Sequence, residues 1–220
     1  TIDYPMASIR FHKFAIEGMQ DIQIQTEKSK AFYFPYVEEK RGVADKLLIE
    51  LAKNAAVVIT DDYPTYFVPQ MTAEAKGSIQ TTYELVDSNG LLPIRIAEKE
   101  YVRAHDFRRF MHKNIEDFLV EVPEKDPLEY LNLKFDEKLL EPIFKKYELV
   151  DFNKVNTQDF LNNLNVDKSV EVSDVVGGYN AAKSRLDLFA KKGFNDYAKL
   201  RSHPSEDASS QLSPYFHFGH

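Results

Sequence analysis

The alternation of helical and strand patterns in the first hundred residues most constrains the fold. Residues 43–55, VADKLLIELAKNA, carry apolar side chains at helical spacing and lead directly into the run AAVVIT, which two aspartates follow. Such an apolar run is typical of a strand buried in a parallel sheet. The order helix, strand, helix, strand therefore predicts an α/β domain, with a parallel sheet flanked by helices.

Other segments of this domain follow the same patterns. A helix is predicted from Ile9 to Ile24, and residues 30–39, KAFYFPYVEE, alternate aromatic side chains as an edge strand does around Pro35. A helix over residues 67–76 and a strand over residues 81–96 continue the alternation. A doubly wound sheet normally begins with a strand, whereas this chain opens on a helix without an initiator Met. We therefore expect the first strand to be missing and the sequence to be cut at this end.

The pattern changes after Arg108, which divides the chain into three predicted regions. Residues 1–108 form the α/β domain. Residues 109–176 carry many charges and short helical patterns broken by prolines, so we expect an interdomain linker that wraps over a neighbouring surface. Residues 177–220 begin a helical domain with one amphipathic helix over 179–200, whose apolar positions are Ala181, Leu186, Phe189 and Tyr197.

Charge and composition exclude several classes of protein. The net charge of −7 argues against a surface that holds nucleic acid by charge alone, although a local basic patch stays open. The chain has no cysteine, which excludes disulfides and thiolate metal sites and suits a reducing compartment. The sequence contains neither a membrane-spanning apolar run nor a signal-peptide pattern, so we expect a cytoplasmic protein without membrane contact.

Polar residues at the two strand ends are the first candidate site. Asp61 and Asp62 follow the first strand, at the edge where parallel sheets bind ligands, but a turn or helix cap is the favoured interpretation. Residues 87–90, DSNG, follow the second strand and favour a tight turn.

A basic stretch and two late histidines are further candidates. The basic side chains could contact phosphate, or they could form the exposed face of a helix whose apolar residues point inward. These basic residues are His105, Arg108, Arg109, His112 and Lys113. His217 and His220 lie three residues apart and lack a third ligand, so they give weak support for a metal site.

The last twelve residues, SSQLSPYFHFGH, contain the most specific cluster. Ser209, Ser210 and Ser213 bring hydroxyl and backbone N–H groups to the start of an aromatic run. A single serine there would indicate an ordinary helix cap. Three serines favour a helix N-terminus that receives a phosphate group.

This tail resembles the flavin-phosphate motif of the photolyase/cryptochrome family, especially the class II-like bacterial DNA photolyases. Further motifs resemble that family in the same order along nearly the whole chain. They are RFHKFAIEGM, VITDDYPTYFVPQM, VDSNGLLPIR, AHDFRRFMHKNI, GGYNAAKSRLDLF and YAKLRSHPSEDASS. One such motif would be suggestive, whereas the ordered series is specific.

The resemblance implies a Rossmann-like antenna-type domain, a linker, and the start of an all-α domain that binds FAD. It implies that Tyr197 contacts the FAD phosphate region and that a loop cradles the diphosphate. The loop residues are Ser209, Ser210, Gln211, Leu212 and Ser213. For the complete protein it implies light-driven, FAD-dependent repair of cyclobutane pyrimidine dimers, with damaged DNA as partner and a monomeric state. The antenna chromophore is not assigned.

Departures from the family pattern limit what this chain does alone. In complete photolyases most of the helical domain follows the phosphate motif, and this sequence contains no Trp for an electron-transfer chain. We therefore expect an N-terminal part of a photolyase that is inactive in isolation. Three alternatives stay open: a cryptochrome-like blue-light photoreceptor, a non-enzymatic nucleotide-binding α/β module, and a non-enzymatic remnant or interaction domain.

Overall fold

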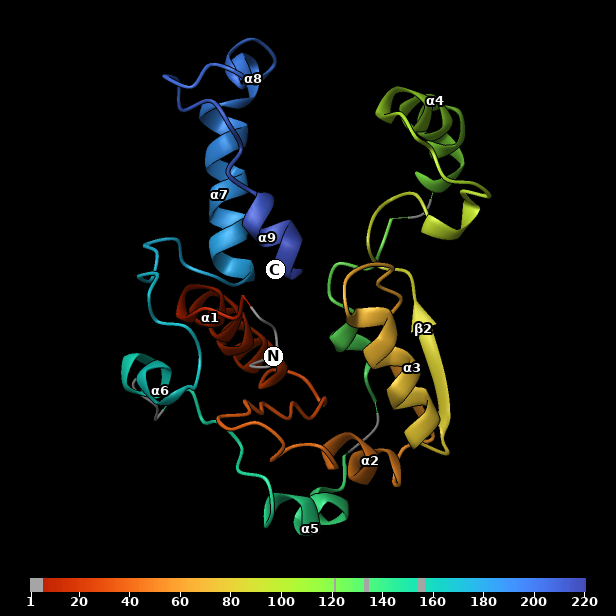
Figure 1. Cartoon of the computed structure of the whole chain (residues 1–220), viewed down its shortest axis with the longest axis vertical. Helices are drawn as coiled ribbons and strands as arrows, with labels where there is room; N and C mark the ends of the chain where they lie inside the picture. The colour runs from red at the N-terminus through yellow and green to blue at the C-terminus, as the bar shows by residue number, and fades with distance from the viewer. Residues whose placement is uncertain (1–5, 121, 133–134, 154–156) are drawn as a thin grey trace. The chain divides into compact units, whose positions relative to one another are not determined.

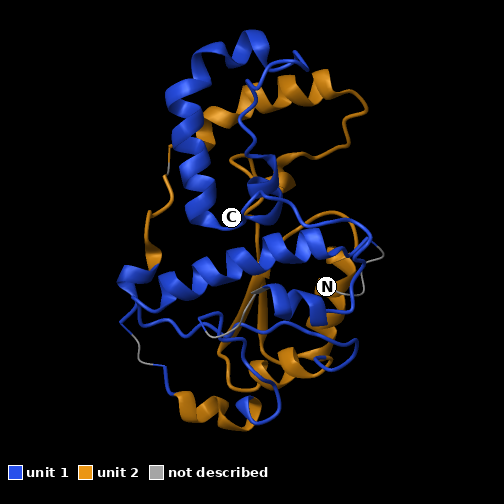
Figure 2. Cartoon of the chain, turned by 90° about the vertical axis from the view of Figure 1, so that its left-hand side faces the viewer, with its two compact units in different colours: residues 1–44, 128–136, 144–220 blue, residues 45–127, 137–143 orange. Residues whose placement is uncertain are grey.

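The computed structural model describes residues 6–120, 122–132, 135–153 and 157–220. The chain divides into two compact units, each assembled from segments that are distant in the sequence (Figure 2). Unit 1 comprises residues 1–44, 128–136 and 144–220, and unit 2 comprises residues 45–127 and 137–143.

Helices predominate in both units (Figure 1). Unit 1 contains α1 (Ile9–Thr26), α6 (Thr157–Asn163), α7 (Tyr179–Lys192), α8 (Phe194–Leu200) and α9 (Ser213–Phe218). Unit 2 contains α2 (Leu47–Ala52), β1 (Val57–Asp61), α3 (Val68–Ser78), β2 (Thr82–Val86) and α4 (Ala104–Asn114). Helix α5 (Glu141–Phe144) and short 3-10 helices at Ile94–Ile96, Ile115–Phe118, Pro127–Tyr130 and Glu137–Leu140 complete the described elements.

Strands β1 and β2 form a parallel sheet in unit 2. The register places Val57 opposite Thr82 and Asp61 opposite Val86, and α3 connects the two strands. A mixed α/β architecture with parallel pairing is thereby confirmed, while a larger Rossmann-like sheet stays a prediction. The expectation that residues 57–61 form a buried strand is wrong, because Ile59 is 59% exposed. A sheet of two strands has too few neighbours to enclose both of its faces.

The edge strand predicted over residues 30–39 is also wrong. This segment has no strand pairing, and the carbonyl of Pro35 accepts a single backbone hydrogen bond from Val150 at 2.9 Å. Its aromatic rings pack instead on later parts of unit 1, with Phe32 4.6 Å from Phe135 between ring centroids. The alternating rings therefore make side-chain contacts, and Pro35 lacks the N–H that a paired strand would donate.

Three predicted elements are shorter in the structure than in the sequence analysis. The helix predicted over 43–55 is confined to α2, and the strand predicted over 81–96 ends at Val86. The helix predicted over 179–200 is interrupted at Gly193, which separates α7 from α8. The Gly193 N–H donates to the Phe189 carbonyl at 2.8 Å and so completes the last turn of α7.

Two apolar clusters form the core of unit 1, and α1 contributes to both. One contains Ile9, Ile16, Val150, Phe152, Leu161 and Leu164, and the other contains Phe14, Ala182, Leu212 and Tyr215. Leu161 and Leu164 of the first cluster are at most 1% exposed. Part of the segment predicted as a linker therefore packs into this core, whereas the domain boundaries themselves stay predictions.

Candidate functional site

The serine-rich loop, residues 209–213, lies between α8 and α9 in unit 1. The chain leaves α8, returns alongside α7 and enters α9 (Figure 1). Leu212 in the loop and Tyr215 in α9 are buried in one cluster with Ala182 of α7 and Phe14 of α1. Apolar packing therefore anchors the C-terminal end of the loop.

Arg185 of α7 holds the other end of the loop. Its Nε donates a hydrogen bond to the carbonyl of Ser210 at 2.9 Å, and its Nη2 donates to the carbonyl of Ser209 at 3.3 Å. Arg185 lies three residues after Ala182, so both contacts come from the same face of α7. Two consecutive peptide groups of the loop are thus bonded to one side chain.

The backbone conformation of the loop is unusual at Gln211, whose φ of 55° lies in the left-handed region. Leu212 follows in the right-handed region at φ −88°. The Gln211 side chain donates to Asp207 Oδ1 at 2.6 Å, and the Leu212 N–H approaches Ser210 Oγ at 3.4 Å. Ser209, Gln211 and Ser213 are exposed, so two of the three serine hydroxyls face solvent.

Tyr197, the remaining predicted cofactor residue, lies in α8. Its ring packs edge-on against Phe189 at 5.3 Å, and the Arg201 guanidinium lies 5.5 Å from the ring centroid. Helices α8 and α9 lie toward opposite ends of α7 (Figure 1). The structure therefore brings residues 209–213 together and places Tyr197 in a different part of unit 1.

A carboxylate from α1 caps the start of α7. Asp21 accepts hydrogen bonds from the Asn180 backbone N–H at 2.8 Å and from the Asn180 side-chain amide at 3.0 Å. A negative charge is favourable there, because the first N–H groups of a helix carry partial positive charge. Gly177 and Gly178 permit this close approach: a Cβ on Gly177 would lie 2.1 Å from the Phe14 carbonyl oxygen, and Gly178 has φ 98°.

His220 joins α7 to α1 from the other end of the sequence. Its Nδ1 accepts a hydrogen bond from the Gly178 N–H at 2.8 Å, and its ring stacks on Phe14 at 4.8 Å between centroids. The bonded ring is therefore the neutral tautomer with its proton on Nε2. Burial lowers the pKa of His220 from its ordinary value of 6.5, and the charges of Asp21 and Glu17 oppose that shift.

The histidine pair named in the sequence analysis does not form a metal centre in the described structure. His217 packs edge-on against Phe218 at 5.0 Å, while His220 is engaged on α1 and α7. Within residues 6–120, 122–132, 135–153 and 157–220, no group of three potential metal ligands comes together.

In unit 2, the aspartates at the end of β1 form an ion pair and hydrogen bonds with the segment that follows β2. Asp62 pairs with Arg95 at 2.6 Å, and its carbonyl accepts a hydrogen bond from the Asn89 side chain at 2.8 Å. Ser88 donates its hydroxyl hydrogen to Asp61 Oδ1. Asp61 therefore lies in β1 and not in a turn, and both carboxylates are engaged by the segment after β2.

Asp87 has a similar structural role. Its Oδ2 accepts a hydrogen bond from the Ile94 N–H at 2.6 Å, and its Oδ1 accepts from Asn89. Burial tends to raise the pKa of Asp87, but the hydrogen bonds from Ile94 and Asn89 bring it below its ordinary value of 3.8. The DSNG segment bends at Asn89, but neither Asn89 nor Gly90 has the positive φ of a tight Asn-Gly turn, so that part of the prediction is wrong.

The basic stretch forms most of α4, so the predicted helix is confirmed, but its apolar residues are only partly turned inward because Phe107 is 40% exposed. On the apolar face, the ring of Tyr101 lies 5.6 Å from Phe107 and 5.2 Å from Phe110. The basic side chains are all exposed: His105, Arg108, Arg109, His112 and Lys113. Their contact with phosphate stays a hypothesis.

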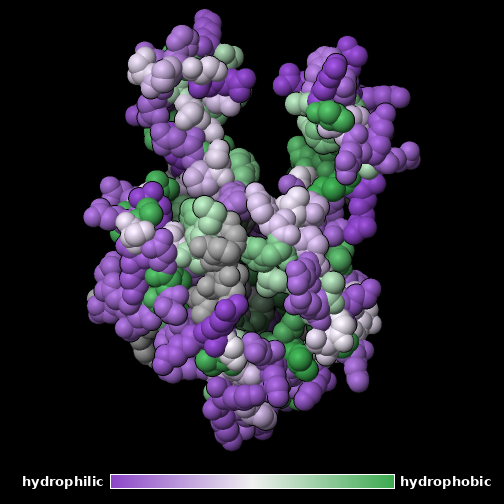
Figure 3. Space-filling model, viewed as in Figure 1, coloured by the Kyte–Doolittle hydropathy of each residue, from purple (hydrophilic) through white to green (hydrophobic). Residues whose placement is uncertain are grey.

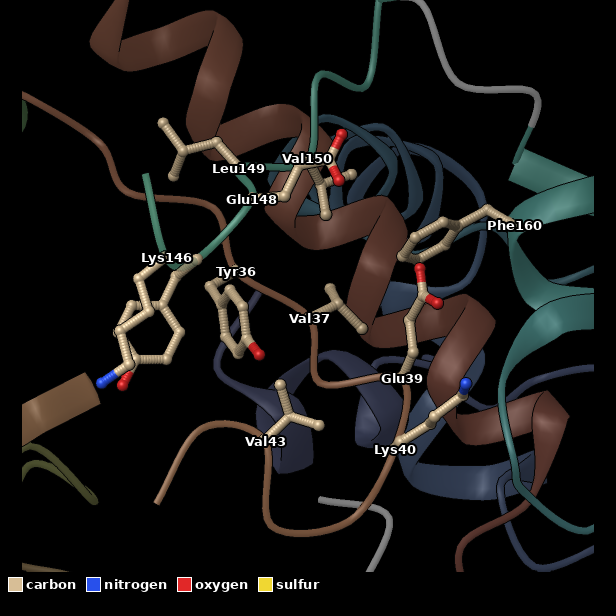
Figure 4. Close-up of a pocket in the computed structure, with 11 residues that line it drawn as sticks. Tyr36, Val37, Glu39, Lys40, Val43, Lys146, Glu148, Leu149, Val150 and Phe160 are labelled. Carbon is tan, nitrogen blue, oxygen red and sulfur yellow. The ribbon is translucent and has the colours of Figure 1, made fainter. Parts of the chain in front are cut away.

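Unit 1 also contains a cavity that the sequence analysis missed (Figure 4). Its volume is about 430 Å³, and it lies between residues 36–43, residues 146–150 and Phe160. Apolar side chains such as Val37 share the lining with Lys40, Glu39 and Lys146 (Figure 4). No local pattern indicates this cavity, because its walls come from three segments that meet only in the folded chain.

No helix in the described part of the chain combines the length and the apolar character needed to cross a bilayer.

Comparisons with known proteins show which sequences this chain is similar to. No family model matches the chain. A protein described as deoxyribodipyrimidine photo-lyase from Methanothermobacter thermautotrophicus is 26% identical over 220 residues, which cover 100% of this chain and 45% of that protein. A protein of the same description from Potorous tridactylus is 26% identical over 219 residues, which cover 97% of this chain and 37% of that protein. The chain is therefore homologous to the photolyase family over its whole length, and it spans under half the length of these relatives.

Proposed function

We propose that this chain supplies the N-terminal part of a deoxyribodipyrimidine photo-lyase that repairs cyclobutane pyrimidine dimers in DNA with light and FAD. The observation that carries the proposal is the homology, which extends over the whole chain in two relatives with the same description. Because the chain matches less than half of either relative, we propose that it is inactive alone. A monomeric state and a cytoplasmic location are part of the same proposal.

The chemistry of the loop fits one part of FAD, its diphosphate. Hydroxyl groups of Ser209 and Ser213 are exposed, and the start of α9 has no side-chain cap. Such donors at a helix start favour a phosphate group. We propose that residues 209–213 would hold the diphosphate, and that Tyr197 would need the remainder of the cofactor site to reach the same ligand. When bound, FAD would supply the electron transfer that splits the cyclobutane ring.

The experiment compares two polypeptides: the 220-residue chain and the product of the complete reading frame of its gene. Each is purified, its bound flavin is measured, and it is incubated with an oligonucleotide that carries one thymine dimer, in light and in darkness. We expect the product of a longer frame to bind FAD and to repair the dimer only in light. The 220-residue chain should repair nothing in either condition.

Other results would favour the alternatives. A full-frame product that binds FAD and responds spectroscopically to blue light, but leaves the dimer intact, would support a cryptochrome-like photoreceptor. Binding of ATP or AMP without flavin would support a nucleotide-binding α/β module. A stop codon directly after His220 would favour a non-enzymatic protein and overturn the proposed photo-lyase activity.

A further inference from the structure

The hydrogen bonds from Arg185 to the serine-rich loop decide which way the polar backbone groups of the loop point. A guanidinium is a rigid, planar donor, and this one is bonded to the carbonyl oxygens of Ser209 and Ser210 at 3.3 and 2.9 Å. Both carbonyls are thereby turned toward α7. Carbonyl oxygens carry partial negative charge, so their placement decides where an anion can approach the loop.

The peptide geometry then fixes the opposite face. No peptide bond among the described residues is cis, and in a trans peptide the C=O and the following N–H point to opposite sides. With the carbonyls of Ser209 and Ser210 held on α7, the N–H groups of Ser210 and Gln211 point away from α7. The backbone turns at the left-handed Gln211, and the next N–H, that of Leu212, is directed at Ser210 Oγ at 3.4 Å.

We propose that Arg185 is a positioning residue that separates the carbonyl oxygens of residues 209–210 from the N–H groups of the same loop. The loop then presents hydrogen-bond donors, and no backbone acceptor from these two peptides, to a diphosphate. The identity of the ligand rests on the proposed function above, whereas the effect of Arg185 on the loop can be measured without any ligand.

The neighbouring contacts explain why an arginine is needed at this position. Ala182, one turn earlier on α7, packs against Leu212 and Tyr215, which brings the loop backbone close to the helix. A lysine ammonium is a point charge and lacks the planar fork that can hold two adjacent carbonyls in fixed directions. Arg185→Lys should therefore keep the charge and lose most of the orientation.

The test uses the 220-residue chain and three variants: Arg185→Gln, Arg185→Lys and the control Lys183→Gln. Lys183 lies on the same helix in an exposed pair with Asp187, so its substitution removes the same charge without touching the loop. NMR order parameters of the Ser210 and Gln211 amides report the loop directly. We expect order parameters of about 0.85 in the parent and in Lys183→Gln, and order parameters below about 0.6 in both Arg185 variants.

The second measurement is the affinity for added FAD and for ADP of the product of the complete reading frame, with and without the substitutions of Arg185. We expect Arg185→Gln to weaken both affinities by about 10-fold, because a loop that is less ordered in the free protein must be ordered when the ligand binds. Unchanged order parameters in both Arg185 variants would overturn the positioning role, even if affinity fell. Loss of order together with unchanged FAD and ADP affinity in the full-frame Arg185→Gln variant would instead overturn the ligand assignment and the phosphate role of the loop.

Folding is checked through the order parameters of α1, which should be the same in all variants. If Arg185→Gln unfolds, Arg185→Lys decides the question, because it keeps the charge and the methylene packing of the side chain.

Discussion

The two units differ in how completely they bury their apolar side chains. In unit 1, Leu161 is 0% and Leu164 is 1% exposed, and α1 contributes to two clusters, one with residues 150–164 and one with residues 182–215. In unit 2, Ile59 of β1 is 59% exposed and Val86 of β2 is 50% exposed. Figure 3 shows a face on which polar residues predominate and apolar residues reach the surface in separate patches.

This difference shows that regular secondary structure and stability are distinct properties of a segment. The two parallel strands in unit 2 pair along their whole length. Parallel sheets, however, normally obtain their stability from layers that cover both faces. The irregular segment around residue 150 in unit 1 has no sheet pairing, and yet it buries Val150 and Phe152 in one cluster with Ile9 and Ile16 of α1. The carbonyl of Val176 accepts a hydrogen bond from the Tyr215 hydroxyl of α9. We infer that, within the described part of the chain, unit 1 contributes more stability per residue than unit 2.

Truncation of a side chain in each unit should break the comparison most clearly. Leu161→Ala removes a fully buried side chain of unit 1, and we expect it to lower the free energy of unfolding by about 2–5 kcal/mol. Ile59→Ala removes a largely exposed side chain, and we expect a loss of about 1 kcal/mol or less. Urea unfolding combined with hydrogen exchange in α1 and β1 reports the two units separately. Equal losses for the two variants would contradict the comparison.

Two glycines offer a test in which the expected effects have opposite signs. A Cβ at Gly177 would lie 2.1 Å from the backbone oxygen of Phe14, so Gly177→Ala must displace α1 or α7 and should cost about 1–3 kcal/mol. Gly77 lies in α3, and a Cβ at this position would have no atom within 4 Å. Because alanine favours a helix more than glycine does, Gly77→Ala should stabilise unit 2 by about 0.5 kcal/mol. Thermal unfolding should show a lower midpoint for the first variant only. A neutral Gly177→Ala would show that α1 and α7 are not in close contact.

The smallest expected effect concerns pH and again separates the units. Because burial lowers the pKa of His220 below 6.5, the neutral ring contributes stability that is present above pH 6.5. That contribution is lost as pH falls through the lowered pKa, since a protonated Nδ1 cannot accept the Gly178 N–H. The protection factors of amides in α9 and at the start of α7, which correct for the slower intrinsic exchange in acid, should therefore fall at acidic pH, while those in α3 change less.

His220→Gln provides the control for this pH effect, because its amide oxygen can accept the same hydrogen bond and does not titrate. We expect the variant to lose the part of the pH dependence that arises at α9. Identical pH profiles for the parent and His220→Gln would assign the effect to another group, such as His12, whose pKa burial also lowers.

Local patterns predicted several elements well and failed where distant contacts decide. The helix predicted from Ile9 to Ile24 is α1, which ends at Thr26, and the predicted α3 and parallel strands are present. Residues 30–39 have the alternation of a strand, but rings such as Phe135 offered an alternative that no local window contains. The break at Gly193 had a signal in the sequence, since two lysines and a glycine are typical of a helix C-terminus.

The candidate site likewise contains residues that the sequence predicted and residues that only the structure revealed. The concentration of serines in residues 209–213 is visible in the sequence, and the structure places them in one loop. Arg185 was not predicted, although its motif was noticed, because its bonds to Ser210 and Ser209 join residues 25 and 24 positions apart, a separation that no local pattern reveals. The same holds for Asp21, which caps a helix 159 residues later in the chain.

The sequence by itself determined the periodic elements, the acidic net charge, the lack of thiol chemistry and the order of motifs that resembles the photolyase family. Only the tertiary structure decided which apolar residues are buried and which polar groups meet, as at Leu161, Arg185 and His220. The physical reason is that helical and strand periodicity arises from neighbouring residues, whereas burial and hydrogen bonding between α1, α7 and α9 require closure of long loops.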